Sequence, residues 1–565
     1  STGNPYCSSG SKNWDTTENL YIEGDNLDVL KLLQESYLGK VKMIYIDPPY
    51  NTGHDFIYHD NFRADDNEFN EQIELFDGNG NKQFRENTVS NPRMHSDWCS
   101  MLYPRLVLAR NLLSNEGVIF ISIDDGEASN LRDICNEIFG ESNFVADLCV
   151  VNNLKGRNDK KYIARANERL LMYVKSQEFN EYGLSLSDNV LTEYNLTDSN
   201  GKYRLLELRK RGGPDTRVER PNMYYPFYVN PDTGEVSLEQ TTSFSIEALP
   251  IKSNGVDGRW RWGKETAQKN IGFLHSRQVG NKYNIYEKDY YESDEGVRRI
   301  RPKSVLAGAG YSTDVATKEY RAIMKEIDFS NPKPVLLLRD LIEYAVSPEE
   351  SSIILDFFSG SATTAHAVMQ LNAEDCGKRK FIMLQLPEVC ADETEAAKAG
   401  YKNICEIGKE RIRRAGEKIK EETGLTAQNL DIGFRVLKLD DTNMKDVYYT
   451  AGEYTQDLLA GKEDNIKGDR TDMDLLYACL LDWGLPLSMP HTHEKIDGFT
   501  IHTYNKGDLI ACFDKHISDA VVKEIAKRQP LRAVFRDSSF TSSPEKINVE
   551  EIFKLLAPNT NVRVI

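Results

Sequence analysis

Residues 41–50 read VKMIYIDPPY. Its apolar, partly β-branched first half predicts a buried β-strand. The strand has to stop at Asp47-Pro48-Pro49-Tyr50, because proline offers no backbone N–H to a sheet and the residue before a proline is held extended. A carboxylate, backbone carbonyls and an aromatic ring are therefore held at the carboxyl end of a strand, where open α/β sheets bind ligands.

This tetrapeptide suits a planar base that carries an amino group. The base can stack on Tyr50, while its exocyclic NH₂ donates one hydrogen bond to Asp47 and one to the carbonyl of Pro48. Both acceptors draw the nitrogen towards tetrahedral geometry, which frees its lone pair for attack. The same residues could instead form only a strand followed by a Pro-Pro turn.

A second strand, turn and helix are expected over residues 352–368, which read SIILDFFSGSATTAHAV. The small residues of the turn let a ligand approach the backbone at a helix N-terminus. By itself this pattern is a weak indication of a Rossmann-like site.

Together, Asp47–Tyr50 and Asp356–Thr364 resemble the two signatures of amino-methyltransferases that use S-adenosylmethionine. The catalytic motif comes first, an order that resembles the beta class of DNA adenine-N6 methyltransferases and above all the modification (Mod) subunit of type III restriction–modification systems. The resemblance runs from about Asn13 to the C-terminus. It implies an α/β fold, with a Rossmann-like methyltransferase sheet interrupted by a target-recognition insert, and a C-terminal α+β domain.

The alternation of strands and helices, which stops at about Ser176 and resumes at about Lys303, predicts the domain limits, and the resemblance implies what the domains are. They are an N-terminal arm (1–18), the catalytic half of the methyltransferase domain (19–176), a target-recognition domain (177–302), the cofactor half (303–435) and a C-terminal domain (436–565). Because the chain starts at Ser1 and relatives usually carry more residues before the first strand, we expect the N-terminus to be truncated.

The roles implied by the resemblance are those of a site-specific adenine-N6 methyltransferase. The catalytic residues are expected to be Asp47, Pro48, Pro49 and Tyr50. The target adenine would leave the stack, because its N6 cannot be reached inside a duplex. The turn residues expected to hold S-adenosylmethionine are Asp356, Phe357, Phe358, Gly360, Ser361 and Thr363.

Four further positions are expected near the cofactor. Asp25 and Asn26 stand at a helix start, where such residues often only cap the helix, but the resemblance suggests that they lie near the adenosine. Lys333, in an Asn-Pro-Lys-Pro segment, could face the cofactor carboxylate. Gln385 ends a strand where many Rossmann-type proteins place an acid for the ribose hydroxyls.

One residue departs from the family signature. Many relatives carry glycine where this chain has Ala362. We expect alanine to be tolerated in a helical first turn, where it is a better helix former than glycine. The exception would be a backbone that needs a positive φ at this position.

Basic residues gather in part of an acidic chain. The net charge of −18 argues against nucleic acid, yet Lys and Arg outnumber Asp and Glu by 14 to 10 between Val151 and Arg220, and a local basic patch is what marks a DNA site. Arginines and aromatics alternate within 177–302, which suits phosphate contacts and base readout, although ordinary surface arginines on a small β-rich domain would look the same. The DNA-binding candidates are Lys155, Arg157, Lys160, Lys161, Arg209, Arg211, Arg217, Arg220, Arg259 and Arg261.

Composition excludes several other classes of protein. With 565 residues, 40% of them hydrophobic and 28% charged, the chain can form several globular domains. No run approaches the ~18 apolar residues of a membrane helix. The nine cysteines show no Cys-x-x-Cys and the nine histidines no His-x-x-x-His, so we expect a reducing bacterial cytoplasm and no metal.

The expected partners are double-stranded DNA, a second copy of the chain in a homodimer, and a restriction subunit. In the cell the protein is expected to associate with the nucleoid when bound to DNA. Two alternatives remain open at this point. The acceptor could be cytosine N4 or RNA instead of adenine, and the chain could be a catalytically silent DNA-binding subunit.

Overall fold

The computed structural model describes residues 10–52, 56–58, 84–86, 92–156, 162–293, 296–325, 327–391, 393–424, 429–445, 465–540 and 543–565. Among these residues, nine strands form the main sheet in the order β17-β6-β7-β5-β2-β18-β19-β1-β20. Their bounds are β1 Leu20–Glu23, β2 Val41–Ile46, β5 Leu113–Ile123, β6 Phe144–Val150, β7 Glu168–Val174, β17 Val305–Leu306, β18 Ile353–Asp356, β19 Lys380–Gln385 and β20 Arg435–Lys438. Neighbouring strands of this sheet are parallel except where β7 pairs with β5 and with β6, so β7 alone among the nine is reversed.

Both faces of the main sheet are buried. Along β2, Met43 and Tyr45 belong to one hydrophobic cluster, whereas Ile44 and Ile46 belong to the other. This division follows from the pleat, because successive side chains of a strand point to opposite faces. It explains why the sequence of β2 is apolar throughout instead of alternating.

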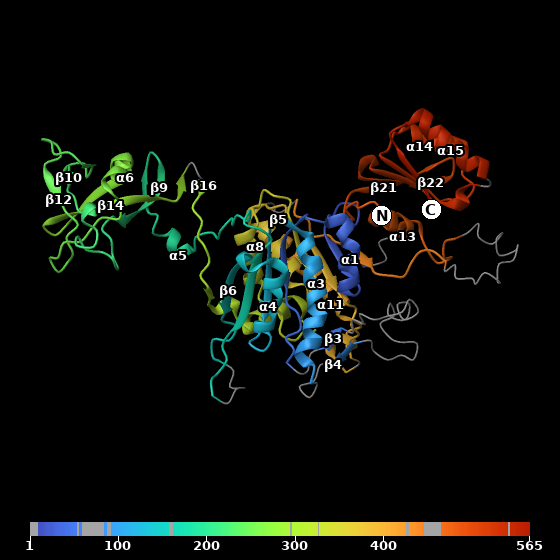
Figure 1. Ribbon diagram of the computed structural model, residues 1–565, viewed down its shortest axis with the longest axis horizontal. Helices are drawn as coiled ribbons and strands as arrows, with labels where there is room; N and C mark the ends of the chain where they lie inside the picture. Colours follow the sequence, from blue (N-terminus) through green and yellow to red (C-terminus); the bar gives the residue numbers. More distant parts are fainter. Residues whose placement is uncertain are drawn as a thin grey trace. The chain divides into compact units, whose positions relative to one another are not determined.

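Helices cover the two faces (Figure 1). One cluster joins the sheet to α1 (Asn26–Tyr37), α3 (Met94–Leu112) and α4 (Ala128–Phe139). The other joins it to α7 (Thr313–Met324), α8 (Val335–Ala345), α9 (Thr363–Asp375) and α11 (Ile404–Thr423). This is the doubly wound α/β arrangement expected for a Rossmann-like sheet.

A second compact unit runs from Gly183 to Arg301, where the sequence predicts an insert over 177–302. It contains a four-stranded sheet, β13-β14-β9-β8, and a three-stranded one, β11-β10-β12. Its own core is built around Phe227, Trp260 and Ile285. The bounds are β8 Leu196–Asp198, β9 Gly201–Glu207, β10 Phe227–Val229, β11 Val236–Ser237, β12 Ile246–Ala248, α6 Lys264–Lys269, β13 Leu274–Val279 and β14 Lys282–Tyr290.

The C-terminal part has a five-stranded sheet of its own, in the order β21-β22-β23-β24-β25. Its elements are α13 Asp472–Asp482, β21 His491–Ile496, β22 Phe499–Tyr504, β23 Leu509–Cys512, α14 Asp519–Lys527, β24 Arg532–Phe535, α15 Ser543–Leu556 and β25 Asn561–Val564. The predicted boundary at 436 falls inside β20, which pairs with β1 and so belongs to the main sheet.

The described part of the stretch expected to form an N-terminal arm is tied to the main sheet. Lys12 bridges Phe434, and the Trp14 side chain is buried. Within the described residues, no helix is long and apolar enough to cross a membrane.

Candidate functional site

The two sequence motifs lie side by side, because β2 and β18 are neighbouring parallel strands. Ile44 pairs with Leu355, so Asp47 follows β2 at the edge where Asp356 ends β18. Both motifs therefore meet at the carboxyl edge of the sheet. The long interval between them in the sequence includes the second compact unit, which is inserted between these two strands.

Residues of α3 hydrogen-bond to the Asp47–Tyr50 turn and to the residue that follows it. Trp98 is fully buried, and its Nε1 donates a 2.7 Å hydrogen bond to the carbonyl of Pro49. The next residue after the turn, Asn51, has φ +59° and donates from its side-chain amide to the carbonyl of Met94. Pro48 is buried. The turn is thus fixed both by its prolines and by contacts from a neighbouring helix.

A cluster of four polar side chains surrounds Asp47 and Tyr50, and we call it the lysine cluster: Asp47, Tyr50, Glu168 and Lys333. Lys333 Nζ donates to the Tyr50 hydroxyl at 2.6 Å and to the two Glu168 oxygens at 2.8 and 2.9 Å. The Tyr50 hydroxyl donates to Glu168 Oε2 at 3.0 Å. Asp47 Oδ1 is buried 3.1 Å from Lys333 Nζ, in an ion pair that lacks hydrogen-bond geometry.

The electrostatics of the lysine cluster keep its lysine charged. Burial alone would lower the pKa of Lys333, but Asp47 and Glu168 raise it above its ordinary value. Burial raises the pKa of Asp47, Lys333 opposes that shift, and Glu168 adds to it. The pKa of Tyr50 is raised by burial and then by the same two carboxylates, so its hydroxyl stays protonated. The sequence predicts Lys333 as a contact of the cofactor carboxylate; that contact stays a prediction.

The turn after β18 has left-handed backbone at two positions, with φ +50° at Gly360 and +60° at Ala362. Ala362 is the N-cap residue of α9, not a residue of its first helical turn. The expectation for Ala362 was therefore wrong, and the exception applies: the backbone has a positive φ where relatives carry glycine.

The Asp356 carboxylate organises this turn. It is buried, and it accepts hydrogen bonds from the Thr364 hydroxyl at 2.5 Å and from the Phe358 backbone N–H at 3.1 Å. Burial raises the pKa of Asp356 to about 7, against the opposing effect of these two hydrogen bonds. The Gln385 side-chain oxygen accepts from the Gly360 N–H at 2.7 Å, so Gln385 braces the turn as well.

A buried arginine of α11 binds the other side of the same turn. Arg411 Nη1 donates to the hydroxyl oxygens of Ser361 at 2.7 Å and Thr363 at 2.6 Å. Its side chain is fully buried, and burial lowers its pKa to about 10. Ser361 and Thr363, predicted as cofactor contacts, are thus oriented by Arg411; no sequence pattern singles out this arginine.

Asp25 and Asn26 connect α1 to the same region. Asp25 caps α1, accepting from Leu27 N–H at 2.8 Å, and Arg105 lies 3.4 Å from its other oxygen. Asn26 is buried and donates to the carbonyl of Phe357 at 2.8 Å. The capping alternative for Asp25 is therefore confirmed, while an additional contact of either residue with adenosine stays a prediction.

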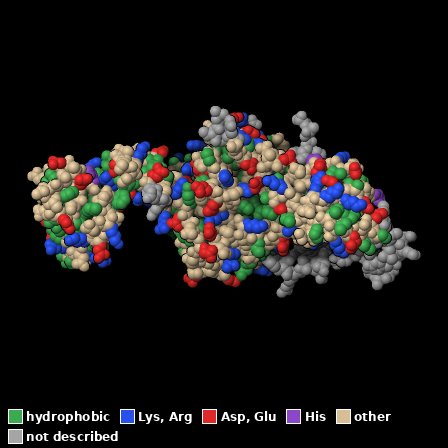
Figure 2. Space-filling model, turned by 90° about the horizontal axis from the view of Figure 1, so that it is seen from above, with side chains coloured by type: hydrophobic (Ala, Val, Ile, Leu, Met, Phe, Trp, Pro, Cys, Tyr) green, Lys and Arg blue, Asp and Glu red, His purple; other side chains and the backbone are tan. Residues whose placement is uncertain are grey.

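The candidate DNA contacts in the 183–301 unit are mostly paired with acids. Glu207 accepts from Arg209 at 3.0 Å and from Arg211 at 2.6 Å. Arg217 pairs with Asp257 at 3.0 Å, and Arg261 pairs with Glu287 at 2.5 Å. Arg259 Nε donates to the carbonyl of Pro214, and Arg220 is exposed. In the face that Figure 2 draws, basic and acidic side chains are interspersed.

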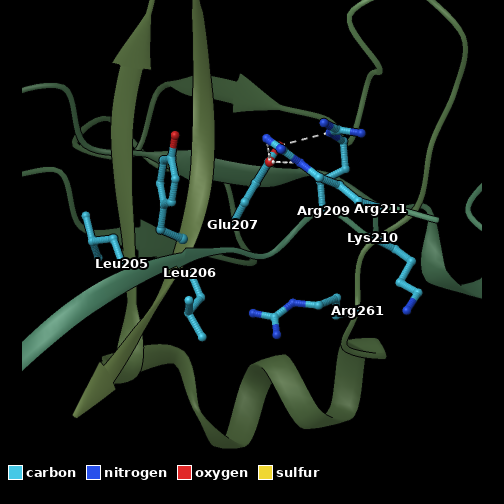
Figure 3. A pocket seen from close by; sticks show the side chains of 8 residues that line it. Leu205, Leu206, Glu207, Arg209, Lys210, Arg211 and Arg261 are labelled. Carbon is cyan, nitrogen blue, oxygen red and sulfur yellow. Dashed lines mark hydrogen bonds and ion pairs between the residues drawn. The ribbon is translucent and has the colours of Figure 1, made fainter. Parts of the chain in front are cut away.

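Several of these arginines line an open pocket of about 530 Å³ (Figure 3). Its walls are made by Leu205, Leu206, Glu207, Arg209, Lys210, Arg211, Arg261 and Tyr286. Of the candidates nearer the catalytic half, Lys155 is exposed, and Arg157, Lys160 and Lys161 lie outside the described residues. Within the described part of the chain, no group of three or more His, Cys, Asp or Glu side chains could hold a metal ion.

Comparison with known proteins gives related sequences for nearly the whole chain. A family model described as DNA methylase matches residues 41–415. The chain is 32% identical to the type III restriction-modification enzyme EcoPI Mod subunit of Escherichia phage P1, over 97% of this chain and 85% of that protein. It is 35% identical to the type II methyltransferase M.KpnI of Klebsiella pneumoniae, over 69% of this chain and 86% of that protein. Among solved structures, a putative DNA modification methylase from Thermus thermophilus in complex with S-adenosyl-L-methionine matches 75% of this chain and 100% of that one, with 11% identity and a TM-score of 0.31.

Proposed function

The chain belongs to the DNA methylase family and is an S-adenosylmethionine-dependent DNA methyltransferase; from that premise we propose that it methylates N6 of adenine as the modification subunit of a type III restriction–modification system. Mod subunits from phage P1 and Escherichia coli are relatives at 32% and 31% identity, each over 97% of this chain. These two matches extend well beyond the methylase region, whereas the type II relative covers 69% of the chain.

The pairing of β2 with β18 is the main observation that supports the proposed methyl transfer. It supports a site in which the acceptor amine and the methyl donor bind next to each other at one sheet edge. We propose that the target adenine leaves the duplex and stacks on Tyr50. Asp47 and the carbonyl of Pro48 then each accept one hydrogen bond from its N6 amine, while Pro49 keeps the turn rigid.

The residues of the Asp356–Thr364 turn fit the cofactor. Gly360 exposes backbone without a Cβ at a positive φ, and the Ser359 hydroxyl is buried with no hydrogen-bond partner among the described residues. When bound, S-adenosylmethionine supplies a methyl group activated by a sulfonium. The chain contributes positioning: the turn, braced by Gln385 and Arg411, holds the donor beside Asp47, and such positioning accounts for much of an enzymatic rate enhancement.

The residues around the cofactor turn fall into two groups, those that contact the cofactor and those that position the contacting residues. The direct cofactor contacts that we propose come from Phe358, Gly360 and the exposed edge of Asp25. The side chains that hold these contacts in place are Asn26, Asp356, Phe357, Ser361, Thr363 and Gln385.

We assign target recognition to the unit from Gly183 to Arg301. The support is its separate core and the arginine-lined pocket of Figure 3. Arginine is the side chain best suited to bidentate contacts with guanine and phosphate. The names of the relatives, type III Mod subunits, support a restriction subunit as partner. We further propose a homodimer, and a bacterial cytoplasmic protein that associates with the nucleoid when bound to DNA.

A labelled-methyl transfer assay tests the proposed function. The purified chain is incubated with unmethylated plasmid DNA and S-[methyl-³H]adenosylmethionine, and the DNA is digested to nucleosides for mass spectrometry. We expect label in N6-methyladenine. Label in N4-methylcytosine, or label only in RNA offered in a parallel reaction, would assign a different acceptor. No transfer by the folded protein would mean that the chain is a catalytically silent DNA-binding subunit.

A further inference from the structure

Glu168 reaches the catalytic edge because β7 runs in the reverse direction. Ile123, the last residue of β5, pairs with Arg169 near the start of β7. The first residue of β7 therefore lies at the edge where its parallel neighbours end. Sequence rules that look for acids at carboxyl ends of strands do not find such a residue.

The contacts of Glu168 are directed at the site. Its side chain is 9% exposed, and its two oxygens accept from Lys333 Nζ and from the Tyr50 hydroxyl, with Asn152 contributing a longer hydrogen bond of 3.3 Å. A carboxylate buried to this degree needs a counter-charge, because leaving it unpaired is strongly destabilising. Lys333 supplies that charge, and it also lies 5.1 Å from the centroid of the Tyr50 ring.

We infer that Glu168 is a positioning residue for methyl transfer, which holds the Tyr50 hydroxyl directly and places the ammonium of Lys333 between itself and Asp47. This inference rests on the proposed function, since it assumes that Asp47 and Tyr50 receive the target base. Glu168 does not touch the base; it acts through Lys333 and Tyr50. Its loss therefore disturbs both the ring that stacks and the charge beside the acceptor carboxylate.

The charged and titratable groups around Asp47 determine the direction in which each substitution should shift the pKa of Asp47. Tyr45 and Tyr50 face it from its own segment, Glu168 from β7, Lys333 from the segment before α8, and Asp356 from β18. After burial, Lys333 lowers the pKa of Asp47 and Glu168 raises it. We take the ionised carboxylate of Asp47 as the form that accepts the hydrogen bond from the amine, so the pKa of Asp47 sets the acid limb of the rate profile.

Two substitutions should therefore move the acid limb in opposite directions. Glu168→Gln removes a negative charge, so the limb should shift to lower pH. Lys333→Met removes the positive charge and should shift it to higher pH. Each shift should be about one unit, as for close charge pairs. In both variants kcat/KM should also fall by about tenfold to a hundredfold, because Tyr50 loses an anchor.

The experiment measures kcat/KM for unmethylated plasmid DNA against pH, at saturating S-adenosylmethionine, after circular dichroism has shown that each variant is folded. The double variant Glu168→Gln/Lys333→Met restores the net charge of the cluster, so its acid limb should return towards that of the wild type while the rate stays low. Lys42→Met is the matched control, because Lys42 is also a largely buried lysine, on β2, paired with Glu116 at 2.9 Å. It should leave the profile unchanged.

The inference fails if the folded Lys333→Met variant keeps the wild-type acid limb, or if both single variants shift it in the same direction. If Glu168→Gln does not fold, the test rests on Lys333→Met alone, whose acid limb should shift to higher pH. A wild-type protein that transfers no methyl group would instead overturn the proposed function, so the two failures are distinguishable.

Discussion

At the scale of single residues, Asp47 is the group on which the proposed chemistry depends. Its side chain is 29% exposed, so one side can face a ligand while Oδ1 is buried beside Lys333. Asp47→Ala should lower methyl transfer about a hundredfold or more, the usual cost of removing a group that stabilises developing charge. DNA affinity should stay within a few fold, because the proposed contact of Asp47 with DNA is limited to the flipped base.

Filter binding and labelled-methyl transfer measure these two quantities in parallel. Asp125→Ala is the control, since Asp125 follows the neighbouring strand β5, is 57% exposed and pairs with Arg165. A near-normal rate for Asp47→Ala would rule out its role as acceptor.

Ala362 is the second informative residue. A left-handed alanine costs roughly 1–2 kcal/mol, but the buried methyl contributes about 0.8 kcal/mol and glycine loses more entropy on folding by about 0.4–1 kcal/mol. These terms nearly cancel, so Ala362→Gly should change the free energy of unfolding by less than about 1 kcal/mol.

Ala362→Val should instead destabilise by about 2 kcal/mol or more, because a β-branched side chain is strained at positive φ and the site is fully buried. Urea unfolding of the free protein measures both values. Equal stability of the two variants would show that the left-handed turn is not rigid.

At the scale of elements, the turn between β18 and α9 is held by α11 through Arg411. Arg411→Met removes the hydrogen bonds to Ser361 and Thr363. The turn should then lose its fixed shape, and the Kd for S-adenosylmethionine should rise about tenfold, which corresponds to about 1.4 kcal/mol.

In this variant the free energy of unfolding should change much less than the free energy of binding S-adenosylmethionine. Arg411 Nε and Nη2 are buried without hydrogen-bond partners among the described residues, and replacing such a charge by an apolar side chain is often close to neutral. Calorimetric titration measures Kd, with Arg414→Met, on the same helix, as the control. Unchanged affinity would mean that Arg411 is only a packing residue.

At the scale of the whole molecule, methyl transfer and sequence recognition are assigned to separate units. Single alanine substitutions at Arg209, Arg211, Arg217, Arg220, Arg259 and Arg261 should sort into two classes. Loss of a phosphate contact lowers affinity for all sequences and reduces the salt slope by about one. Loss of a guanine contact costs about 1–3 kcal/mol on the cognate site alone.

Because Arg209 and Arg211 pair with Glu207, removing the charge of Glu207 should increase DNA affinity. Glu207→Gln should raise affinity for plasmid DNA at low salt and steepen its salt dependence, because two arginines lose their intramolecular partner. Glu239→Gln, an exposed acid of the same unit, is the control. If no arginine variant alters affinity or site preference, recognition lies elsewhere, and the stretch from Lys155 to Arg169 is the next candidate.

Sequence alone determined the features that depend on neighbouring residues. The buried strand before Asp47, its termination by two prolines and the small-residue turn after β18 follow from local periodicity and from proline geometry. The sequence also predicts an insert over 177–302, because the alternation of strands and helices stops there; the structure has a separate compact unit from Gly183 to Arg301. That the two motifs share one edge of the sheet follows from the pairing of β2 with β18, which the structure shows.

Contacts between residues distant in the sequence could be seen only in the folded protein. Glu168 reaches the site because β7 is reversed, and strand direction is set by the order of the whole sheet. Arg411 meets Ser361 and Thr363 because α11 packs behind the turn, and Lys333 meets Asp47 across the same edge. The positive φ of Ala362 likewise depends on how the turn is held. Such contacts are fixed by long-range packing, which no local pattern of residues encodes.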